Sequence, residues 1–364
     1  MGTAAGDDTP LGVAARAAAH HRSASLTRSP RHCGPLPWRS AAVPCSPTHR
    51  RSPTLRTVFF GSSDFAIPAL RSLVQAGRTP ALVVTKPDAP RGRGRKIYDS
   101  EVKLGAQELG LPCAQPDDPH GDDFLGTLRE LKPDLGIVIS YGVILKPALL
   151  GLPRHGMINA HASLLPLYRG AAPIQWAIRD GREETGVTIV RIAEALDAGD
   201  VLLTRTTPID PKENAGSLRE RLAAMSGEAL VEACERIEKG TAKYAPQNHG
   251  KATYARKVEK EHGVIDWKLP AVEIDRLVRA MTPKPGAQTR LGNRRFIVIE
   301  GSVEQDLYGM GIPGALQSSG EEGIRVCTGS GLYRITRIKP DNGRSMSAGE
   351  FVRGHHITPD ARFG

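Results

Sequence analysis

The sequence contains no Cys-x-x-Cys pair and no long apolar run. Its five cysteines are scattered among 364 residues, so neither a disulfide framework nor a zinc site is expected. No stretch approaches the roughly 20 apolar residues that a bilayer crossing requires, so we expect no membrane contact. Gly61-Ser-Ser follows the first apolar strand where a dinucleotide-binding enzyme would have Gly-x-Gly-x-x-Gly. These absences favour a cytoplasmic protein that holds no metal ion.

The net charge of +10 is divided unevenly along the chain. Residues 1–55 carry seven arginines and two aspartates, which gives +5. Residues 56–245 carry 24 basic and 24 acidic side chains, whereas residues 246–364 carry 18 basic and 13 acidic ones, which again gives +5. A basic balance indicates acidic partners, so the C-terminal third is a candidate for contacts with a nucleic-acid backbone.

Residues 1–54 are rich in Ala, Arg, Ser, Pro and His and show no periodic apolar pattern. Such a segment buries too little apolar surface to offset the entropy of ordering, so we expect a disordered basic extension. Its composition would also suit a transit peptide, although Asp7, Asp8 and several prolines argue against an amphipathic targeting helix. An upstream translation or a dispensable extension is the simpler interpretation.

From residue 56 onward, short apolar strands alternate with amphipathic helices. Strands are expected at 57–60, 81–85, 135–140, 157–159, 187–192 and 201–205, and helices near 64–74, 102–109, 124–131, 147–150, 172–178 and 217–239. Strands that alternate with helices form right-handed crossovers and hence a parallel sheet. The pattern predicts an α/β domain over residues 55–243 with a doubly wound, Rossmann-like parallel sheet.

A second domain is expected after a polar, basic linker at residues 244–262. A helix at 272–281 precedes short strands at 295–299, 323–327 and 332–338, which Gly-rich turns separate. Short strands at this spacing are typical of a small antiparallel β-barrel. We therefore expect an OB-like barrel over residues 263–364.

Three polar residues, Asn159, His161 and Asp197, follow apolar strand cores. Because ligands bind at the carboxyl ends of parallel strands, we expect all three at one edge of the sheet. Each alone has an ordinary explanation as a packed residue or part of a turn. Acyl transfer to an amine needs a donor for the developing oxyanion, a group that handles the amine proton and a residue that orients that group. Together the three side chains can fill these roles.

A long motif surrounds two of these residues. From residue 159 to residue 170 the chain reads Asn-Ala-His-Ala-Ser-Leu-Leu-Pro-Leu-Tyr-Arg-Gly, and Thr-Gly-Val-Thr and Leu-Asp-Ala-Gly-Asp follow. This order resembles the formyltetrahydrofolate-dependent formyltransferases. The resemblance implies that Asn159, His161 and Asp197 are catalytic and that 10-formyltetrahydrofolate is the co-substrate. The loop implied to bind the folate consists of Ser163, Leu164, Leu165 and Pro166.

Four further features resemble the methionyl-tRNA formyltransferases within that family. They are Gly61-Ser-Ser-Asp-Phe65, Arg169-Gly-Ala-Ala-Pro-Ile174, Ala252-Thr-Tyr-Ala255 with Ile265-Asp-Trp267, and Met346-Ser-Ala348. The resemblance covers about residues 56–364. It departs where the family often has Gly-Thr-Pro for Gly61-Ser-Ser and Gly for Ala162, and neither change touches the catalytic trio. It implies formyl transfer to methionyl initiator tRNA for translation initiation, with a tRNA-binding C-terminal domain.

Residues 86–96, Lys-Pro-Asp-Ala-Pro-Arg-Gly-Arg-Gly-Arg-Lys, carry five positive charges directly after the second strand. Such a segment cannot pack in a core, so we expect a flexible loop that can neutralise phosphates. Charge runs are usually solvated surface, but the position beside the expected active site of a neutral domain favours binding. By the resemblance, this loop contacts the tRNA acceptor stem. The residues expected to do so are Arg91, Arg93, Arg95 and Lys96.

The catalytic signature alone leaves the acceptor open. Glycinamide ribonucleotide formyltransferases, nucleotide amino-sugar formyltransferases and formyltetrahydrofolate hydrolases share it, although the first resemble the catalytic domain alone. A non-catalytic nucleic-acid-binding module is a different alternative, but it would have no need of the trio. With the folate and methionyl initiator tRNA as partners, we expect the protein to act as a monomer.

Overall fold

The computed structural model describes residues 55–91, 96–304, 311–355 and 357–364. The expected disordered extension at residues 1–54 lies outside these ranges, as do Arg93 and Arg95, two of the predicted tRNA contacts. For the other two, Arg91 and Lys96, only the course of the backbone is described.

Seven strands form the sheet of the first domain, in the order β10-β9-β7-β6-β1-β2-β5. They are β1 (Thr57–Gly61), β2 (Leu82–Val84), β5 (Cys113–Ala114), β6 (Leu135–Ile139), β7 (Met157–His161), β9 (Glu184–Arg191) and β10 (Val201–Pro208). The pairs among β1, β2, β5, β6 and β7 are parallel, whereas β9 runs antiparallel to both β7 and β10. The Rossmann-like prediction is confirmed, with one reversed strand that it did not include.

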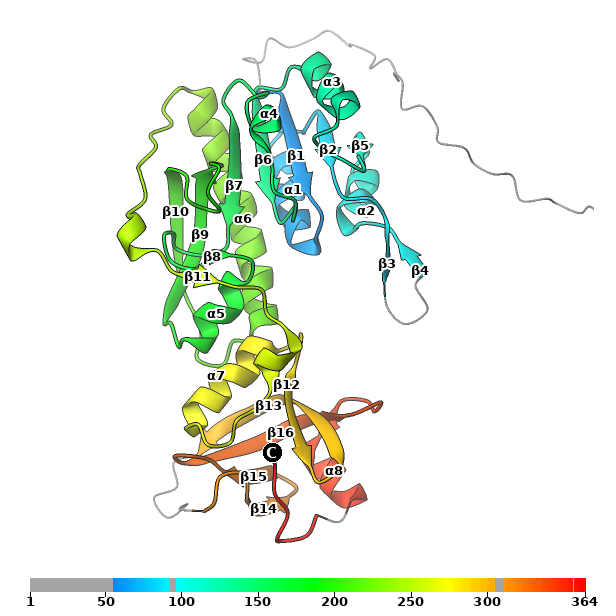
Figure 1. Ribbon diagram of the computed structural model, residues 1–364, viewed down its shortest axis with the longest axis vertical. Helices are drawn as coiled ribbons and strands as arrows, with labels where there is room; N and C mark the ends of the chain where they lie inside the picture. The colour runs from blue at the N-terminus through cyan, green and yellow to red at the C-terminus, as the bar shows by residue number, and fades with distance from the viewer. Residues whose placement is uncertain (1–54, 92–95, 305–310, 356) are drawn as a thin grey trace, which may run out of the picture. The chain divides into compact units, whose positions relative to one another are not determined.

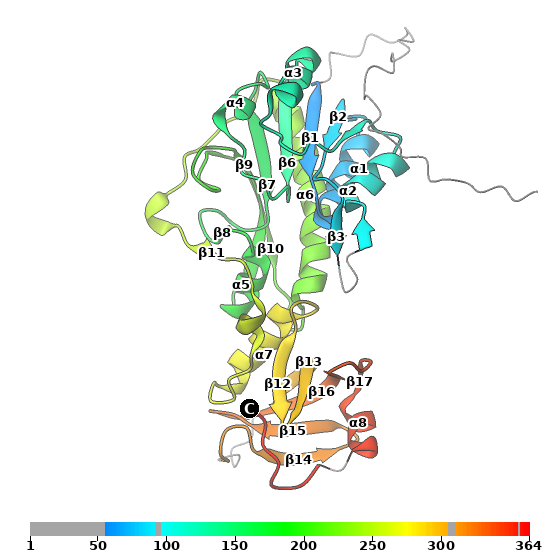
Figure 2. The same cartoon turned by 45° about the vertical axis from the view of Figure 1, so that its right-hand side comes forward.

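Helices lie on both faces of this sheet (Figures 1 and 2). The helices of the domain are α1 (Ile67–Gln75), α2 (Glu101–Glu108), α3 (Asp122–Leu131), α4 (Pro147–Leu150), α5 (Pro173–Arg179) and α6 (Ala215–Glu238). The face with α1, α2 and α6 buries Phe59 and Ile158, and the face with α3 and α4 buries Phe60 and Met157. Side chains alternate between the faces of a strand, so continuous apolar runs form strands that are buried on both sides.

A short parallel pair connects the linker to the first domain. β8 (Arg169–Gly170) pairs with β11 (Tyr254–Ala255), and Figure 1 shows the pair beside β9 and β10. The linker also contains two 3-10 helices, η2 (His249–Lys251) and η3 (Lys260–Gly263), and a further one, η1 (Asp64–Ala66), precedes α1. The linker expected at residues 244–262 therefore packs on the catalytic-domain side for part of its length.

The basic segment at residues 86–96 is not a loop throughout, which corrects the expectation. β3 (Ala89–Arg91) and β4 (Lys96–Tyr98) form an antiparallel hairpin in which Arg91 lies opposite Lys96. Pairing of this kind satisfies backbone N–H and C=O groups without any need for apolar side chains. Charge and glycine content therefore concealed two short strands.

The second domain is an antiparallel sheet preceded by a helix. Its elements are α7 (Ala271–Met281), β12 (Ala287–Leu291), β13 (Arg294–Glu304), β14 (Leu316–Gly320), β15 (Gly323–Cys327), β16 (Leu332–Pro340), β17 (Met346–Ser347) and α8 (Ala348–Gly354). The strand order is β12-β13-β16-β15-β14, with β17 on β16. Bridges from Phe363 to Leu291 and from Arg362 to Ala315 join the two outer strands through the last residues of the chain. The sheet thus closes into the small antiparallel barrel that was expected.

No helix within the described residues is both long enough and apolar enough to cross a membrane.

Candidate active site

Asn159 and His161 lie on one face of β7. Two residues apart on a strand, their side chains share a face at a separation of about 7 Å along the strand. Ile158 and Ala160, which alternate with them, pack into the core beneath α6. Within the described residues the half-buried Asn159 carboxamide has no hydrogen-bond partner. That amide is therefore available to a ligand on the face opposite α6.

His161 has an oxygen atom near each of its ring nitrogens, one of them at hydrogen-bond distance. Its side chain is 7% exposed, and its Nε2 lies 2.8 Å from the carbonyl oxygen of Tyr168. A carbonyl only accepts, so Nε2 carries the proton in that bond. Nδ1 lies 3.5 Å from Oδ2 of Asp197. Both ring nitrogens face oxygen acceptors. The geometry therefore suits an imidazole that carries a proton on each nitrogen and is paired with a carboxylate.

Asp197 reaches His161 by a route other than the expected one. It follows β9, whose last residue, Arg191, pairs with Ile158 near the start of β7. Because β9 is reversed, the loop after it begins at the opposite edge of the sheet and turns back over the face that carries His161. The expectation that the trio meets at the carboxyl edges of parallel strands is therefore wrong in its topology. His161 and Asp197 are nevertheless in contact.

The loop that carries Asp197 is tightly constrained. Asp197 has a φ of 50°, in the left-handed region that non-glycine residues seldom adopt. Its Oδ2 also accepts a 2.9 Å hydrogen bond from the backbone N–H of Gly170. A Cβ on Gly199 would lie 1.9 Å from the carbonyl oxygen of Arg191, so only glycine permits the close approach to β9. The carboxylate is thus placed by its own loop and by β8 together.

Two buried side chains, Arg169 and Gln247, support this loop. The sequence did not indicate that they pair. Gln247 Nε2 donates to the carbonyl oxygens of Asp197, at 2.8 Å, and of Gly199, at 2.7 Å. Its Oε1 accepts a 2.7 Å bond from Nη2 of Arg169, and that nitrogen also donates to Nδ1 of His249 at 3.0 Å. Both Arg169 and Gln247 are more than nine-tenths buried. This network joins the catalytic motif to the segment before β11.

Hydrogen bonds within the predicted folate loop and from Thr188 fix its shape. The Ser163 hydroxyl donates to the carbonyl of Leu167 at 2.6 Å. Thr188, opposite His161 in β9, donates to the Ser163 carbonyl at 2.7 Å and accepts from the Leu165 N–H at 3.2 Å. Ser163 is fully buried, whereas Leu164, Leu165 and Pro166 are partly exposed. The serine thus shapes the loop, and the three residues after it present its surface.

The basic hairpin is anchored at the carboxyl edge of the sheet. Lys86 donates from Nζ to the carbonyl of Gly142, in the loop after β6, at 2.7 Å. Asp88 accepts bonds from Lys103 at 2.5 Å and from Gln115 at 2.7 Å, and these two bonds lower the pKa of Asp88 to about 2. Asp88 is therefore ionised at neutral pH. The hairpin leaves the sheet at β2, three strand spacings or about 14 Å from β7.

Among the described residues, no three His, Cys, Asp or Glu side chains cluster in a way that would hold a metal ion. The groups gathered at β7 are hydrogen-bond donors and one carboxylate–imidazole pair, which suit acyl transfer. Two family models match the chain: that of formyl transferases over residues 55–234 and that of the formyl transferase C-terminal domain over residues 257–356. The chain belongs to the formyl transferase family.

Relatives of this formyl transferase match it over nearly their whole length. It is 41% identical over 310 residues to the methionyl-tRNA formyltransferase of Geobacter metallireducens, a match over 85% of this chain and 99% of that protein. It is 44% identical over 300 residues to the methionyl-tRNA formyltransferase of Marinobacter nauticus, over 82% and 96% of the two chains.

Two solved structures share the fold of this formyl transferase. One is the N-formyltransferase of Helicobacter canadensis in complex with folinic acid and dTDP-3-aminofucose, with a TM-score of 0.58, 18% identity and coverage of 80% of this chain and 100% of that one. The other is HypX of Aquifex aeolicus in complex with tetrahydrofolic acid, with a TM-score of 0.56, 20% identity and coverage of 82% and 47%. At these identities the similarity concerns the fold alone.

Gln247→Leu is expected to destabilise this formyl transferase and to slow it. The substitution leaves two loop carbonyls without partners and the buried Arg169 guanidinium with His249 alone, so the free energy of unfolding should fall by about 3 kcal/mol. Displacement of Asp197 should lower kcat by about tenfold with little change in the KM for folate. Denaturant unfolding and steady-state kinetics measure the two effects.

Gln247→Glu separates packing from positioning. The glutamate retains an acceptor for Arg169 but loses the amide that donates to the Asp197 and Gly199 carbonyls, so kcat should fall while the part of the stability due to the Arg169 bond is kept. Gln288→Leu is the matched control, because the Gln288 side chain makes a single 3.4 Å bond to the Lys260 carbonyl. A Gln247→Leu protein with the kcat of the Gln288→Leu protein would remove Gln247 from any positioning role.

Proposed function

We propose that this formyl transferase moves the formyl group of 10-formyltetrahydrofolate to the free amino group of methionyl initiator tRNA. The observation that carries the proposal is the match to methionyl-tRNA formyltransferases over both domains. One of these relatives is 41% identical and is matched over 99% of its own length. The product, N-formylmethionyl-tRNA, serves translation initiation. We expect the protein to act in the cytoplasm and as a monomer.

The proposed chemistry assigns one task to each member of the trio. The amine adds to the formyl carbon, and the free amide of Asn159 donates to the oxygen that gains negative charge. The positive charge of the His161 imidazolium stabilises the same charge, and Asp197 holds the imidazolium. The bond from the formyl carbon to N10 of the folate then breaks as N10 gains a proton. Either the imidazolium gives that proton and takes up the one lost by the amine, or a water molecule carries the proton between them.

The folate is assigned to the loop that follows β7. Leu164, Leu165 and Pro166 offer a partly exposed apolar surface, and Ser163 holds the shape of the loop from inside. The loop begins two residues after His161, so a folate bound there would present its formyl group to the imidazole. Residues 55–243 would thus form the catalytic domain.

The tRNA is assigned to the basic hairpin and to the barrel. The hairpin segment carries Arg91, Arg93, Arg95 and Lys96 in a domain whose total net charge is zero, and the hairpin is anchored on the carboxyl edge of the sheet. Residues 263–364 carry 14 basic and 11 acidic side chains. Basic groups on both domains suit a long polyanion better than a small acceptor.

Arg93→Gln with Arg95→Gln is expected to weaken the use of tRNA without slowing the chemical step. Loss of two phosphate contacts should raise the KM for methionyl-tRNA by about 10- to 100-fold and reduce the slope of log(kcat/KM) against log[salt] by about 2. The measurement is formylation kinetics across a salt series. Arg71→Gln is the control, because Arg71 is an exposed arginine that pairs with Glu108 on the surface. Equal salt slopes for the two proteins would exclude the hairpin from tRNA binding.

The acceptor is tested directly by competition. The protein is incubated with 10-formyltetrahydrofolate and methionyl initiator tRNA, and with free methionine or a nucleotide amino-sugar as the competing amine. Formylmethionine on the tRNA is the expected product. Preferential formylation of the amino-sugar would move the protein to the other acceptor class, and failure to formylate any amine would favour a non-catalytic binding module.

A further inference from the structure

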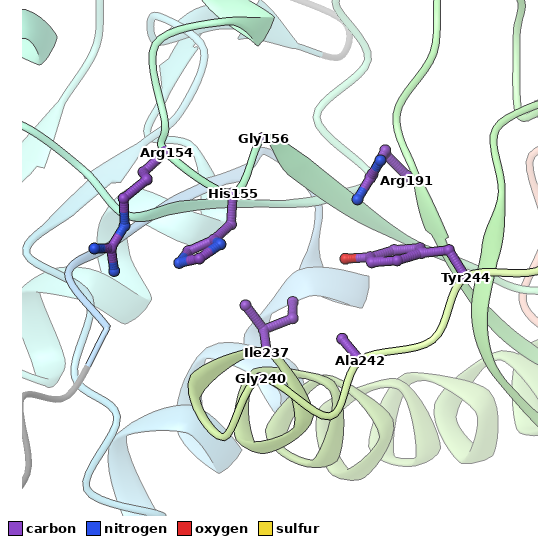
Figure 3. A pocket seen from close by; sticks show the side chains of 8 residues that line it. All are labelled: Arg154, His155, Gly156, Arg191, Ile237, Gly240, Ala242 and Tyr244. Atoms are coloured by element: carbon purple, nitrogen blue, oxygen red, sulfur yellow. The ribbon is translucent and has the colours of Figure 1, made fainter.

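A pocket lies away from the trio, between the start of β7 and the end of α6. Figure 3 shows its lining, and its volume is about 480 Å³. Small-molecule sites commonly measure about 300–1,000 Å³, so this pocket has room for a metabolite-sized ligand. Neither the proposed reaction nor the proposed tRNA contacts use it.

The pocket is on the opposite face of the sheet from the candidate active site. Arg191 lies opposite Ile158 in the pairing of β9 with β7, and opposed residues project on the same face. Ile158 packs in the core beneath α6, as does Ile237 of the pocket lining. Asn159 and His161 project on the other face. A ligand in this pocket would therefore be separated from the folate site by the thickness of the sheet.

Positive charge gathers around the pocket. Arg154 and His155 line one side and Arg191 another, and the lining includes no acidic residue. Arg154 is partly neutralised by Asp134, 3.2 Å away, but its side chain remains 68% exposed. Arg191 has no carboxylate partner among the described residues. An uncompensated guanidinium beside a cavity favours an anionic ligand, and phosphate fits its paired N–H groups.

The Arg191 guanidinium is held in place by an aromatic ring. Its central carbon lies 4.0 Å from the centroid of the Tyr244 ring. Stacking of this kind orients the guanidinium plane and leaves its N–H edge free for an acceptor. In Figure 3 the hydroxyl end of Tyr244 points toward His155, so both rings border the same space. The donors are thus arranged before any ligand arrives.

The remaining wall is apolar. Ile237, at the end of α6, and Ala242, after it, lie below Tyr244 in Figure 3. A bare inorganic ion would leave this surface in contact with water, whereas a flat organic group would cover it. The combination of cations on one side and an apolar floor on the other indicates a ligand with both kinds of group.

We propose that this pocket binds a small phosphorylated compound with a flat unsaturated ring, of the size of a mononucleotide. Arg191, oriented by Tyr244, binds its phosphate, the ring lies over Ile237 and Ala242, and His155 donates a hydrogen bond from the opposite side of the pocket. The site goes beyond the proposed formyl transfer and does not depend on it.

The probe is adenosine monophosphate, titrated calorimetrically into the full-length protein, with adenosine and inorganic phosphate as partial ligands. Saturable binding of the nucleotide, at least tenfold tighter than either part, is expected. Arg191→Gln should weaken that binding by about tenfold or more, as loss of a charge-assisted bond predicts. Ala242→Phe should weaken it by filling the pocket while every charge remains. Arg71→Gln, with the same charge change on α1, should leave it unchanged.

Two results would overturn the proposal. The first is no saturable binding of the nucleotide, or binding that Arg191→Gln and Ala242→Phe leave intact. The second is a loss of tRNA affinity in Arg191→Gln without nucleotide binding by the unaltered protein, because the phosphates would then belong to the nucleic acid. Formylation by the same preparation tests the proposed function separately.

Discussion

His161→Ala is expected to lower kcat for formyl transfer by about 10³-fold, the range in which removal of an oxyanion donor or a proton-transfer group falls. His161 and Asp197 are paired within the trio, with His161 Nδ1 at 3.5 Å from Oδ2 of Asp197. Its Nε2 bond to the Tyr168 carbonyl fixes the ring plane. Alanine removes the donor and also leaves the carboxylate without its counter-charge.

Single-turnover formylation at saturating substrate concentrations measures this loss at the chemical step. Folate affinity should change by less than about threefold, because the loop at residues 163–166 is held by Thr188 and not by the imidazole. Asn159→Ala, which removes no side-chain hydrogen bond among the described residues, should lower kcat as well while leaving the unfolding temperature within a few degrees. A His161→Ala enzyme with normal turnover would contradict the assignment of the trio as catalytic residues.

Asp197→Asn is expected to lower kcat by about 10²-fold, since the imidazolium loses the charge that stabilises it. The substitution preserves shape, and the remaining side-chain oxygen can still accept from the Gly170 N–H. The loop should therefore stay in place. The effect then reports on charge and not on folding.

Asp200→Asn is the matched control. Asp200 lies in the same loop, loses the same charge, and has no side-chain partner among the described residues. Its kcat should stay within about twofold of the unaltered enzyme, because the substitution removes no side-chain bond among the described residues. Equal losses in the two variants would show that the effect belongs to the net charge of the loop and would remove Asp197 from the mechanism.

The fold was predictable because its signals are local. Continuous apolar runs such as Leu135–Ile139 predict strands that are buried on both faces, and helical periodicity between such runs predicts crossover helices. The direction of β9 was not predictable in this way. The apolar pattern of a strand is the same whether the strand runs parallel or antiparallel to its neighbour. The resemblance to the family motif predicted that Asp197 lies beside His161, whereas the predicted topology did not place it correctly.

The support of the site could not be found from local pattern. Arg169 and Gln247 are 78 residues apart in the chain, and neither lies in a periodic segment that marks it as buried. Ser163 illustrates a related limit. A motif can show that a serine belongs to a binding loop, but only the structure shows that its hydroxyl points inward to Leu167. Burial of a polar side chain depends on hydrogen-bond partners that cannot be identified from the local sequence.

The parallel pairing of β8 with β11 bears on how such proteins can be recombined. The family matches end at residue 234 and resume at residue 257, yet Gln247, Thr253 and Ala255, which bond to the segment after His161, all lie in the interval between. A chimera that takes its catalytic and C-terminal domains from two relatives would inherit this interval from only one of them. The breakpoint therefore belongs after residue 256, so that the interval travels with the catalytic motif it supports.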